Sequence, residues 1–484
     1  MNYKMMGRFL ALILTVEAVF MLPALGISLF DGTQRVTYAF LITIGVLFAI
    51  SAILALFTRR AEQIFFAKEG LLCVGVGWIL MSVFGCLPFF LSGEIPHFVD
   101  ALFEMVSGFT TTGASVVSDV EALSRATLYW RSFSHWLGGM GVLVFLLALV
   151  PVSGKNEGFT MHLLRAESPG PNVGKLVPKM RTTALVLYSC YLALTVVNVV
   201  FLLLGGMPFF EALCTAFGTA GTGGFGVKND SIASYSPYIQ NVCTVFMLLF
   251  GINFGCFYLL ILKQFREVLR DEELKLYLGI VVGSIVLITL NILHLYDSVW
   301  DSLRYASFQV SSIITTTGFS TVDYDLWPNF SKAILLILMM IGACAGSTGG
   351  GLKCARLLLI LKGVRRNFAQ MLKPNKVQVI RVNDKPVDEK MIANTNTYLC
   401  VYMLILFVSF LLISVDGFSV LTNFSAVLST FNNIGPGFDA VGPVCNFSIY
   451  SPLSKVVLIV DMLAGRLEIF PILVLLFPST WKRS

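Results

Sequence analysis

Four short polar segments, each built around glycine, interrupt an otherwise apolar chain. They read TTTGAS (110–115), GTGGFG (221–226), TTTGFS (315–320) and NIGPGF (433–438). Glycine allows backbone conformations that a side chain forbids, and threonine adds a hydroxyl oxygen beside the backbone carbonyls. Rings of such oxygens can replace the hydration shell of a cation. The four segments therefore predict a pathway for cations that is lined by oxygen.

The four segments are copies of one internal repeat. Aligned on a single glycine each, their equivalent positions are Gly113, Gly223, Gly318 and Gly435. The preceding residue is threonine in the first three copies and Ile434 in the fourth. A self-similar period of about 100 residues indicates a repeated architecture, with a divergent fourth copy.

A short amphipathic stretch precedes each segment. The four stretches read HFVDALFEMVSGF, PFFEALCTAFG, SVWDSLRYASFQVSSI and NFSAVLSTF. Three carry an acidic residue near the start (Asp100, Glu211 and Asp301), which suits a helix N-terminus. Because about three turns cannot cross a bilayer, we predict re-entrant pore helices whose negative C-terminal ends point at one axis. A single such segment would favour a simple helix–loop turn; the fourfold recurrence favours the pore.

The elements that must position these segments are membrane-spanning helices. The chain has 484 residues, of which 56% are hydrophobic and 13% charged, and its mean hydropathy is +0.81. Soluble proteins are about a quarter charged, so the composition indicates a polytopic all-α membrane protein. Two leading spans are predicted near 9–30 and 36–57. Outgoing spans are predicted near 71–91, 185–204, 276–295 and 398–415, and returning spans near 128–150, 242–262, 333–361 and 456–476.

The basic residues support ten crossings with both termini on one side. One set of connections holds most of them: Arg59, Arg60, Lys68, Lys155, Arg165, Lys175, Lys179, Arg181, Lys263, Arg266, Arg270, Arg356, Lys362, Arg365, Arg366, Lys373, Lys376, Arg381, Lys482 and Arg483. The opposite loops hold few. The positive-inside rule then predicts cytoplasmic termini and polar segments that face outward. The basic stretch 353–381 would suit anionic lipid headgroups or an acidic soluble partner equally well.

Each returning span carries a second small-residue cluster. The clusters are GGMG (138–141), GINFG (251–255), GACAGSTGGGLK (342–353) and DMLAGR (461–466). Glycine clusters break or bend a spanning helix, and the third is too rich in Gly, Ser and Thr to stay helical. We predict that it forms a loop inside the membrane, below the polar segments, that obstructs the pathway and moves aside. Close helix packing explains the weaker clusters GGMG and GINFG about equally well, and a nucleotide-binding loop is disfavoured because no strand precedes it.

Arg466 is the most unusual charge, because it lies inside the last apolar span. Such an arginine normally faces an interior cavity or a carboxylate. One hypothesis is an ion pair with Asp461 or Glu468 that locks helices together. The other is a positive charge beside the pathway that limits cation passage. Lys353, at the end of the third cluster, could reach the same cavity.

The fourfold span–pore–span plan, the single glycine in each polar segment and the two leading spans resemble the TrkH-type subunits of the Trk/Ktr/HKT potassium-transporter superfamily. The resemblance covers essentially the whole chain. It implies one pseudo-fourfold, potassium-channel-like pore, a gating loop in the third repeat, and an arginine beside the pathway. It also implies potassium selectivity, which the family associates with glycine rather than serine at Gly113. Ile434 and Pro436 depart from the pattern of the other repeats.

The resemblance also implies which residues act. Backbone carbonyls of a selectivity filter would bind potassium at Thr110, Thr111, Thr112, Gly113, Ala220, Gly221, Thr222, Gly223, Thr315, Thr316, Thr317, Gly318, Asn432, Asn433, Ile434 and Gly435. The gate would comprise Gly342, Gly346, Ser347, Thr348, Gly349, Gly350, Gly351, Lys353 and Arg466. Implied partners are a TrkA-type ring of cytosolic nucleotide-binding regulatory subunits and a second copy in a homodimer, with a separate pore in each protomer. The implied location is the bacterial inner membrane.

We divide the chain accordingly into leading helices (1–70) and four pore repeats (71–155, 156–270, 271–390 and 391–484).

The ten cysteines form no CxxC pair, and the four histidines lie far apart, so a transition-metal site or disulfide framework is disfavoured. We expect no cofactor in this chain, no nucleic-acid partner and no enzyme activity; membrane lipid is a partner, and potassium is the substrate. A sodium- and potassium-permeable pathway and an ion-coupled symporter of the same fold remain open. A secondary transporter for a small solute is less favoured, because those folds use inverted repeats.

Overall fold

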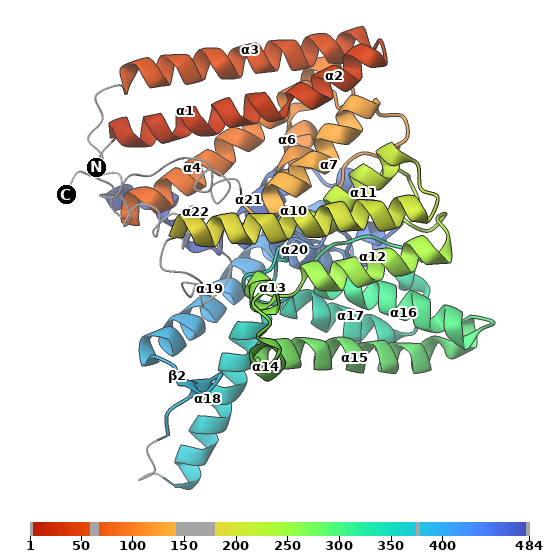
Figure 1. The fold of residues 1–484 in the computed structure, drawn as a ribbon, viewed down its shortest axis with the longest axis vertical. Helices are drawn as coiled ribbons and strands as arrows, with labels where there is room; N and C mark the ends of the chain where they lie inside the picture. Colours follow the sequence, from red (N-terminus) through yellow and green to blue (C-terminus); the bar gives the residue numbers. More distant parts are fainter. Residues whose placement is uncertain (1–2, 59–66, 142–179, 374–377, 481–484) are drawn as a thin grey trace.

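The computed structural model describes residues 3–58, 67–141, 180–373 and 378–480. These residues are largely helical, and their only sheet is the hairpin of β1 (Arg381–Val382) and β2 (Lys385–Pro386) (Figure 1). Several sequence predictions fall outside this part of the chain. They concern Arg59, Arg60, Lys155, Arg165, Lys175, Lys179, Lys376, Lys482 and Arg483, the side chains of Lys68 and Arg181, the first returning span beyond residue 141, and the boundary between residues 155 and 156.

The two leading spans form a pair on one side of the molecule (Figure 1). The first comprises α1 (Tyr3–Phe20) and α2 (Leu22–Phe30), with Pro23 in the first turn of α2, and the second is α3 (Gln34–Phe57). Helices α1 and α3 pack along each other, and the Ser51 hydroxyl donates a 2.7 Å hydrogen bond to the Ala11 carbonyl oxygen. Polar contacts between packed helices are common where lipid offers no alternative partner. Both predicted spans are confirmed.

Each of the four repeats begins with an outgoing helix and continues into a pore helix. The outgoing helices are α4 (Ala67–Gly85) with its extension α5 (Leu87–Ser92), α10 (Met180–Leu204), α15 (Glu272–Ile292) and α19 (Glu389–Ile413). The pore helices are α6 (Phe98–Phe109), α11 (Phe209–Gly221), α16 (Val299–Ile314) and α20 (Val420–Phe431). The three predicted acidic residues lie in the first turns of α6, α11 and α16.

The returning helices are broken, as the small-residue clusters predict. They are α7 (Arg125–Gly139); α12 (Pro237–Phe250) with α13 (Phe254–Ile261); α17 (Asn329–Ile341) with α18 (Cys354–Leu372); and α21 (Pro452–Arg466) with α22 (Phe470–Leu476). Helices α12 and α13 meet at an angle of 90°. The third cluster forms a loop between α17 and α18, as predicted. Serine caps start three of these helices: Ser124, Ser236 and Ser451 accept N–H bonds in the first turns of α7, α12 and α21.

Among the described residues the returning helices are broken, and the predicted first returning span continues past residue 141, outside them, so a count of long helices does not include all ten predicted crossings. The described residues contain six helices that are long and apolar enough to cross a membrane, or seven if the bent α12–α13 pair is one span. Short helices α14 (Phe265–Arg270), η1 (Leu293–Leu295), η2 (Tyr324–Leu326), η3 (Ser414–Asp416), η4 (Asp439–Val441), η5 (Phe447–Ile449) and η6 (Pro478–Thr480) complete the described elements.

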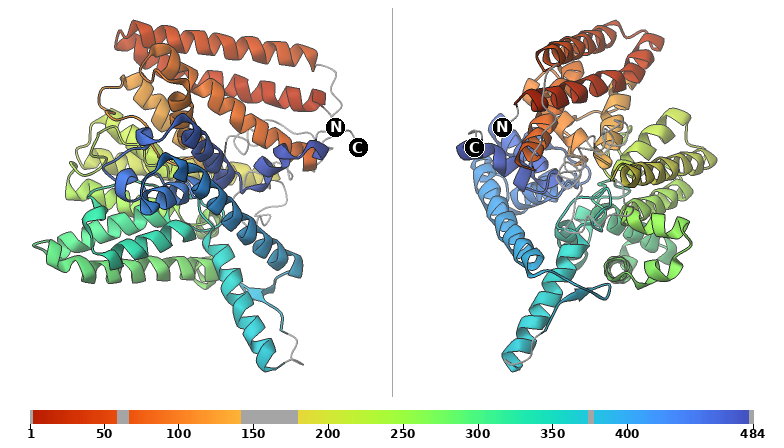
Figure 2. Two further views of the ribbon diagram at one scale, coloured as in Figure 1. Left: turned by 180° about the vertical axis from the view of Figure 1, so that it is seen from behind. Right: turned by 60° about the vertical axis from the view of Figure 1, so that its left-hand side comes forward.

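The four repeats surround a common centre, as the right-hand view of Figure 2 shows from their orange, green, teal and blue ribbons. The pore helices converge there, and each packs on returning helices: α6 on α7 and α21, α11 on α7 and α12. Helix α18 projects beyond the other helices, beside the β1–β2 hairpin (Figure 1). The predicted fold class, two leading helices plus four span–pore–span repeats around one pseudo-fourfold axis, is confirmed.

Candidate functional site

The backbone of the four polar segments repeats closely at the end of each pore helix. One residue in each takes a left-handed conformation: Thr111 (φ 55°), Thr222 (53°), Thr316 (59°) and Asn433 (56°). Two residues further on, a glycine is also left-handed: Gly113 (φ 79°), Gly224 (76°), Gly318 (84°) and Gly435 (104°). This conformation is costly for other residues, so the second position favours glycine in every repeat.

The positions of the two left-handed residues correct the sequence alignment in the second repeat. The residue between the two left-handed positions donates its N–H to a carbonyl five residues earlier: Thr112 to Ser107, Gly223 to Gly218, Thr317 to Ser312 and Ile434 to Ser429, at 2.8–2.9 Å. Gly223 is therefore equivalent to Thr112, and Gly224 is the equivalent of Gly113. The sequence alignment was wrong by one residue, because GTGGFG contains two adjacent glycines and the alignment used the first of them, Gly223. The equivalent segments are 110–113, 221–224, 315–318 and 432–435.

The four segments close into a ring. A Cβ atom added to Gly113 would overlap the carbonyl oxygen of Gly223, one added to Gly224 would overlap that of Thr317, and one added to Gly318 would overlap that of Ile434. The circle closes at Gly435, where an added Cβ would lie 2.9 Å from the carbonyl oxygen of Thr112. Each glycine thus allows its segment to contact a carbonyl of the next repeat. Side chains at these positions would force the four segments apart.

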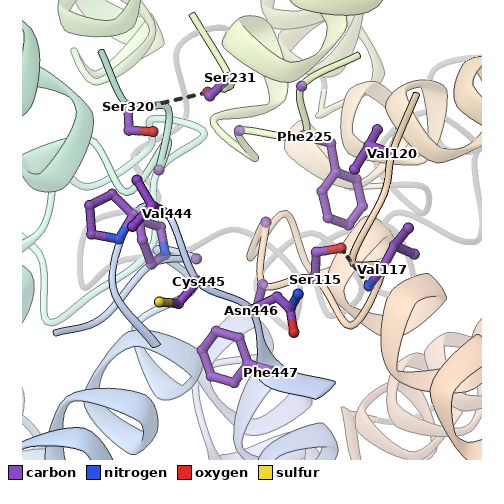
Figure 3. A pocket seen from close by; sticks show the side chains of 18 of the residues that line it. Ser115, Val117, Val120, Phe225, Ser231, Ser320, Val444, Cys445, Asn446 and Phe447 are labelled. Atoms are coloured by element: carbon purple, nitrogen blue, oxygen red, sulfur yellow. Dashed lines mark hydrogen bonds between the residues drawn. The ribbon is translucent and has the colours of Figure 1, made fainter. Parts of the chain in front are cut away.

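A cavity of about 140 Å³ opens on one side of this ring (Figure 3). All four ring glycines line it, together with the loops that follow each segment, which supply Ser115, Phe225, Ser320 and Cys445. Around it, Arg131 forms a buried 2.5 Å ion pair with Glu104 and donates to the Gly226 carbonyl, while its guanidinium lies 3.5 Å from the centre of the Phe225 ring. We call this cavity the vestibule.

The role of Glu104 and Arg131 was missed at the level of sequence. Glu104 accepts from the Ser115 hydroxyl and the Val116 N–H at 3.0 Å each, so it holds the chain that leaves the first segment. The sequence did contain a signal, because the amphipathic periodicity around Glu104 and Arg131 places both charged residues at positions that should be buried. The sequence could not show that these two charges face each other.

The polar side chains of the segments brace the ring from behind. The hydroxyls of Thr110 and Thr112 lie 2.8 Å apart, as do those of Thr315 and Thr317. In the divergent fourth segment, Asn432 exchanges hydrogen bonds with Tyr402, and Asn433 Nδ2 donates to Thr112 Oγ1 and the Met462 carbonyl at 2.9 Å each. Ile434 is fully buried, while its carbonyl oxygen lies against Gly318. Asparagines therefore replace the threonine bracing without opening the ring.

The 342–353 loop lies directly against the other side of the ring. The Gly350 N–H donates a 2.6 Å hydrogen bond to Thr316 Oγ1, and a Cβ on Gly349 would lie 2.8 Å from the Thr315 carbonyl oxygen. A Cβ on Gly350 would overlap the Asn432 carbonyl oxygen. The loop therefore contacts the third and fourth segments through the backbone of Gly349 and Gly350.

Hydrogen bonds hold the rest of the loop in place. Left-handed Gly342, Gly346 and Gly351 shape it, and the Ser347 hydroxyl donates to Cys344. Phe254 N–H donates to the Gly346 carbonyl, and Thr348 N–H donates to the Phe250 carbonyl, so the break between α12 and α13 supports the loop. Lys353, which is buried, donates to the Gly349 carbonyl through Nζ.

Arg466 joins the ring, the loop and α7. Its guanidinium donates to Thr111 Oγ1 at 3.2 Å, to the Thr348 carbonyl at 2.8 Å, and to the carbonyls of Gly138 and Gly139. The carboxylates considered as its partners bond elsewhere: Asp461 accepts from Ser409 at 2.6 Å, and Glu468 pairs with Arg356. These contacts place the guanidinium among backbone carbonyls of the loop and α7, beside the first segment.

Asp325, in the loop after the third segment, provides a test of stability. Burial raises the pKa of Asp325 to about 6 from 3.8, although the 2.9 Å hydrogen bond from the Asp439 N–H opposes the rise. A raised pKa means that protonation stabilises the fold, and that this stability is lost as pH rises through about 6. We expect Asp325→Asn to raise the melting temperature at pH 8 by up to about 2 °C, since the group is half-exposed. The gain should vanish below pH 4; an equal gain at both pH values would contradict this.

Comparison with known proteins gives one consistent family. The family model TrkH, described as "Cation transport protein", matches residues 37–482. The "Trk system potassium uptake protein TrkH" of Salmonella typhimurium is 36% identical over 491 aligned residues, and that of Escherichia coli K12 is 35% identical, each alignment covering both chains completely. The crystal structure of the potassium transporter TrkH from Vibrio parahaemolyticus superposes with a TM-score of 0.87 at 33% identity, covering 100% of both chains.

Proposed function

This chain belongs to the TrkH family of cation transport proteins, and we propose that it carries potassium into the cell through a gated, channel-like selective pore. It is a transport protein and not an enzyme. The observation that carries the proposal is the ring, in which each of four glycines contacts a carbonyl oxygen of the next repeat. Four backbone segments held this closely present rings of oxygens to an ion on the axis.

In this proposal the segments 110–113, 221–224, 315–318 and 432–435 coordinate potassium through backbone carbonyls. The four pore helices end at the ring, and each carries roughly half a negative charge at its C-terminus, which favours a cation there. Ala220 is then the last pore-helix residue before the second segment and not a ligand. The relatives named as potassium uptake proteins support potassium as the substrate.

The 342–353 loop and Arg466 form the gate in this proposal. The loop covers the face of the ring opposite the vestibule, and Arg466 places a positive charge at Thr111. A cation that leaves the ring meets both the backbone of the loop and the positive charge of Arg466. Conduction requires the loop to move, and the hydrogen bonds from Phe254, Thr348 and Gly350 break and re-form as it does.

Orientation and partners follow from the same proposal. The vestibule faces outward, both termini face the cytoplasm, and the protein lies in the bacterial inner membrane. Helix α18, which follows the 342–353 loop directly, and the β1–β2 hairpin extend beyond the other helices (Figure 1). They provide a surface for a TrkA-type regulatory ring, and the protein assembles as a homodimer with one pore in each protomer. The word "system" in the relatives' names is consistent with further subunits.

The function is tested by ion flux into proteoliposomes that contain the full chain. We expect potassium and rubidium to pass, and sodium and lithium to pass at least about tenfold more slowly. The ring has a fixed size and a fixed number of carbonyl oxygens, and it favours ions whose lost hydration those oxygens can replace. Equal passage of all four ions would overturn the selective pore and favour the sodium- and potassium-permeable alternative. Potassium flux that requires a sodium or proton gradient would instead identify a symporter.

A further inference from the structure

The second segment of the ring lacks the side chains that brace the other three. Its residues at the two bracing positions are Gly221 and Gly223, where the first segment has Thr110 and Thr112. The left-handed φ of Gly224 would strain any other residue, but the φ of Gly223 lies outside that region. The backbone at Gly223 would therefore accept a side chain. A side chain at Gly223 is excluded by the lack of space around it and not by the backbone conformation.

The space at Gly223 is filled by His135 from α7, a helix of the first repeat. A Cβ added to Gly223 would overlap the imidazole, lying 2.6 Å from its Cδ2. A Cβ added to Gly221 would overlap the carbonyl oxygen of His135. Helix α7 thus packs directly against the second segment because both glycines lack side chains. His135 is completely buried there.

The imidazole bonds to the second repeat and to the pore helix of its own repeat. Its Nε2 accepts a 3.3 Å hydrogen bond from the N–H of Phe225, the residue directly after Gly224. Its Nδ1 lies 2.8 Å from the carbonyl oxygen of Gly108, in the last turn of pore helix α6. Since Nε2 accepts, Nδ1 carries the proton and donates, and the ring is neutral. The Phe225 ring packs on the imidazole, with centroids 4.1 Å apart.

The fourth repeat has equivalent positions on its own returning helix. A Cβ on Gly138 would overlap the carbonyl of Phe109, the last residue of α6, and a Cβ on Gly465 would overlap that of Phe431, the last residue of α20. Three residues before each glycine lie His135 and Met462, which are therefore equivalent. The fourth segment has its own buried side chain, Ile434, where the second has Gly223. Helix α7 packs on the pore helix of the second repeat as α21 packs on that of the first, so the position beside α21 that is equivalent to Gly223 is Thr112, which keeps its side chain.

We propose that His135 is a positioning residue that sets the cation selectivity of the ring by fixing the second segment against the first. This inference rests on the proposed function. The Gly223 carbonyl lies against Gly113, so any outward shift of the second segment displaces an oxygen of the ring. Selectivity depends on the number and field of those oxygens. The imidazole prevents the shift by filling the space behind Gly223 and by bonding Phe225 and Gly108.

The test compares potassium-to-sodium flux ratios in proteoliposomes for the full-length protein and its variants. We expect His135→Phe, which keeps volume but loses both hydrogen bonds, to lower the ratio about tenfold. His135→Gln retains a donor and an acceptor and should stay within about threefold of the wild type. Gly223→Val should lose selectivity because it collides with the imidazole. The double variant H135A/G223V should recover much of the loss, because it removes the imidazole with which the valine collides.

The controls separate this inference from the function on which it rests. Tyr129→Phe removes a hydroxyl from the same helix, where the ring packs on Phe133 and Phe217, and should leave the ratio unchanged. A wild-type protein that passes both ions equally would overturn the proposed function itself. A selective wild type with an unchanged ratio in His135→Phe would overturn only the role of His135. If His135→Phe does not fold, the comparison of Gly223→Val with H135A/G223V tests the inference. A flux ratio for H135A/G223V no higher than that for Gly223→Val would overturn it.

Discussion

Replacement of Arg466 by alanine should raise potassium flux about tenfold or more. The guanidinium lies at Thr111 Oγ1 and at the Thr348 carbonyl, between the ring and the 342–353 loop. A unit charge near 4 Å from a passing cation contributes about 4 kcal/mol of repulsion at an effective dielectric constant of 20, and each 1.4 kcal/mol changes a rate about tenfold. Removing the charge lowers that barrier and also releases the loop. The measurement is potassium flux in proteoliposomes.

Two further variants separate charge from structure in this prediction. Arg466→Lys keeps the charge but loses the planar guanidinium that bonds the Thr348, Gly138 and Gly139 carbonyls together, so its flux should lie between those of the wild type and Arg466→Ala. Arg125→Ala removes an exposed arginine that pairs with Asp31 at 3.4 Å, and it should change nothing. A folded Arg466→Ala protein with unchanged or lower flux would contradict the gating role.

Serine at Gly113 or Gly224 should reduce the potassium-to-sodium flux ratio about tenfold or more, with flux retained. Both glycines are left-handed, at φ 79° and 76°, which costs another residue about 1–2 kcal/mol. The added Cβ would also overlap the carbonyl oxygens of Gly223 and Thr317, respectively. The ring must widen to relieve this overlap, and a wider ring compensates less well for the lost hydration of potassium.

The effect at Gly224 also tests the corrected register. If Gly224 and not Gly223 closes the ring, Gly224→Ser should match Gly113→Ser in its effect on selectivity. Gly279→Ala serves as the control, because Gly279 lies in α15, an added Cβ there would meet no atom within 4 Å, and the ratio should stay unchanged. A selective, folded Gly224→Ser protein would contradict the ring geometry in the second repeat.

Much of the fold could be predicted because it depends on local pattern. The apolar runs marked the leading and outgoing helices to within a few residues at most ends, and the acidic residues Asp100, Glu211 and Asp301 marked the starts of three pore helices. The third small-residue cluster predicted the loop between α17 and α18, since no helix tolerates that density of glycine. These features require only hydropathy, helix propensity and repetition.

The site was less predictable, because its details depend on contacts between repeats. The sequence identified the glycine-containing segments but misplaced the second by one residue, because GTGGFG offers two adjacent glycines and only the backbone conformation distinguishes them. Arg466 was recognised as a buried charge, yet its bonds to Thr111 and Thr348 join parts of the chain more than 100 residues apart.

The amino-acid sequence alone determined that this protein is a fourfold repeat of membrane helices with a glycine at the end of every pore helix, because hydrophobic length and backbone freedom are properties of single segments. Only the tertiary structure decided which glycine closes the ring, that asparagines brace the fourth segment, and that His135 fills the space behind the second. These depend on which atoms meet across repeats, and close packing leaves room there for either a side chain on the segment or one inserted from a neighbouring helix.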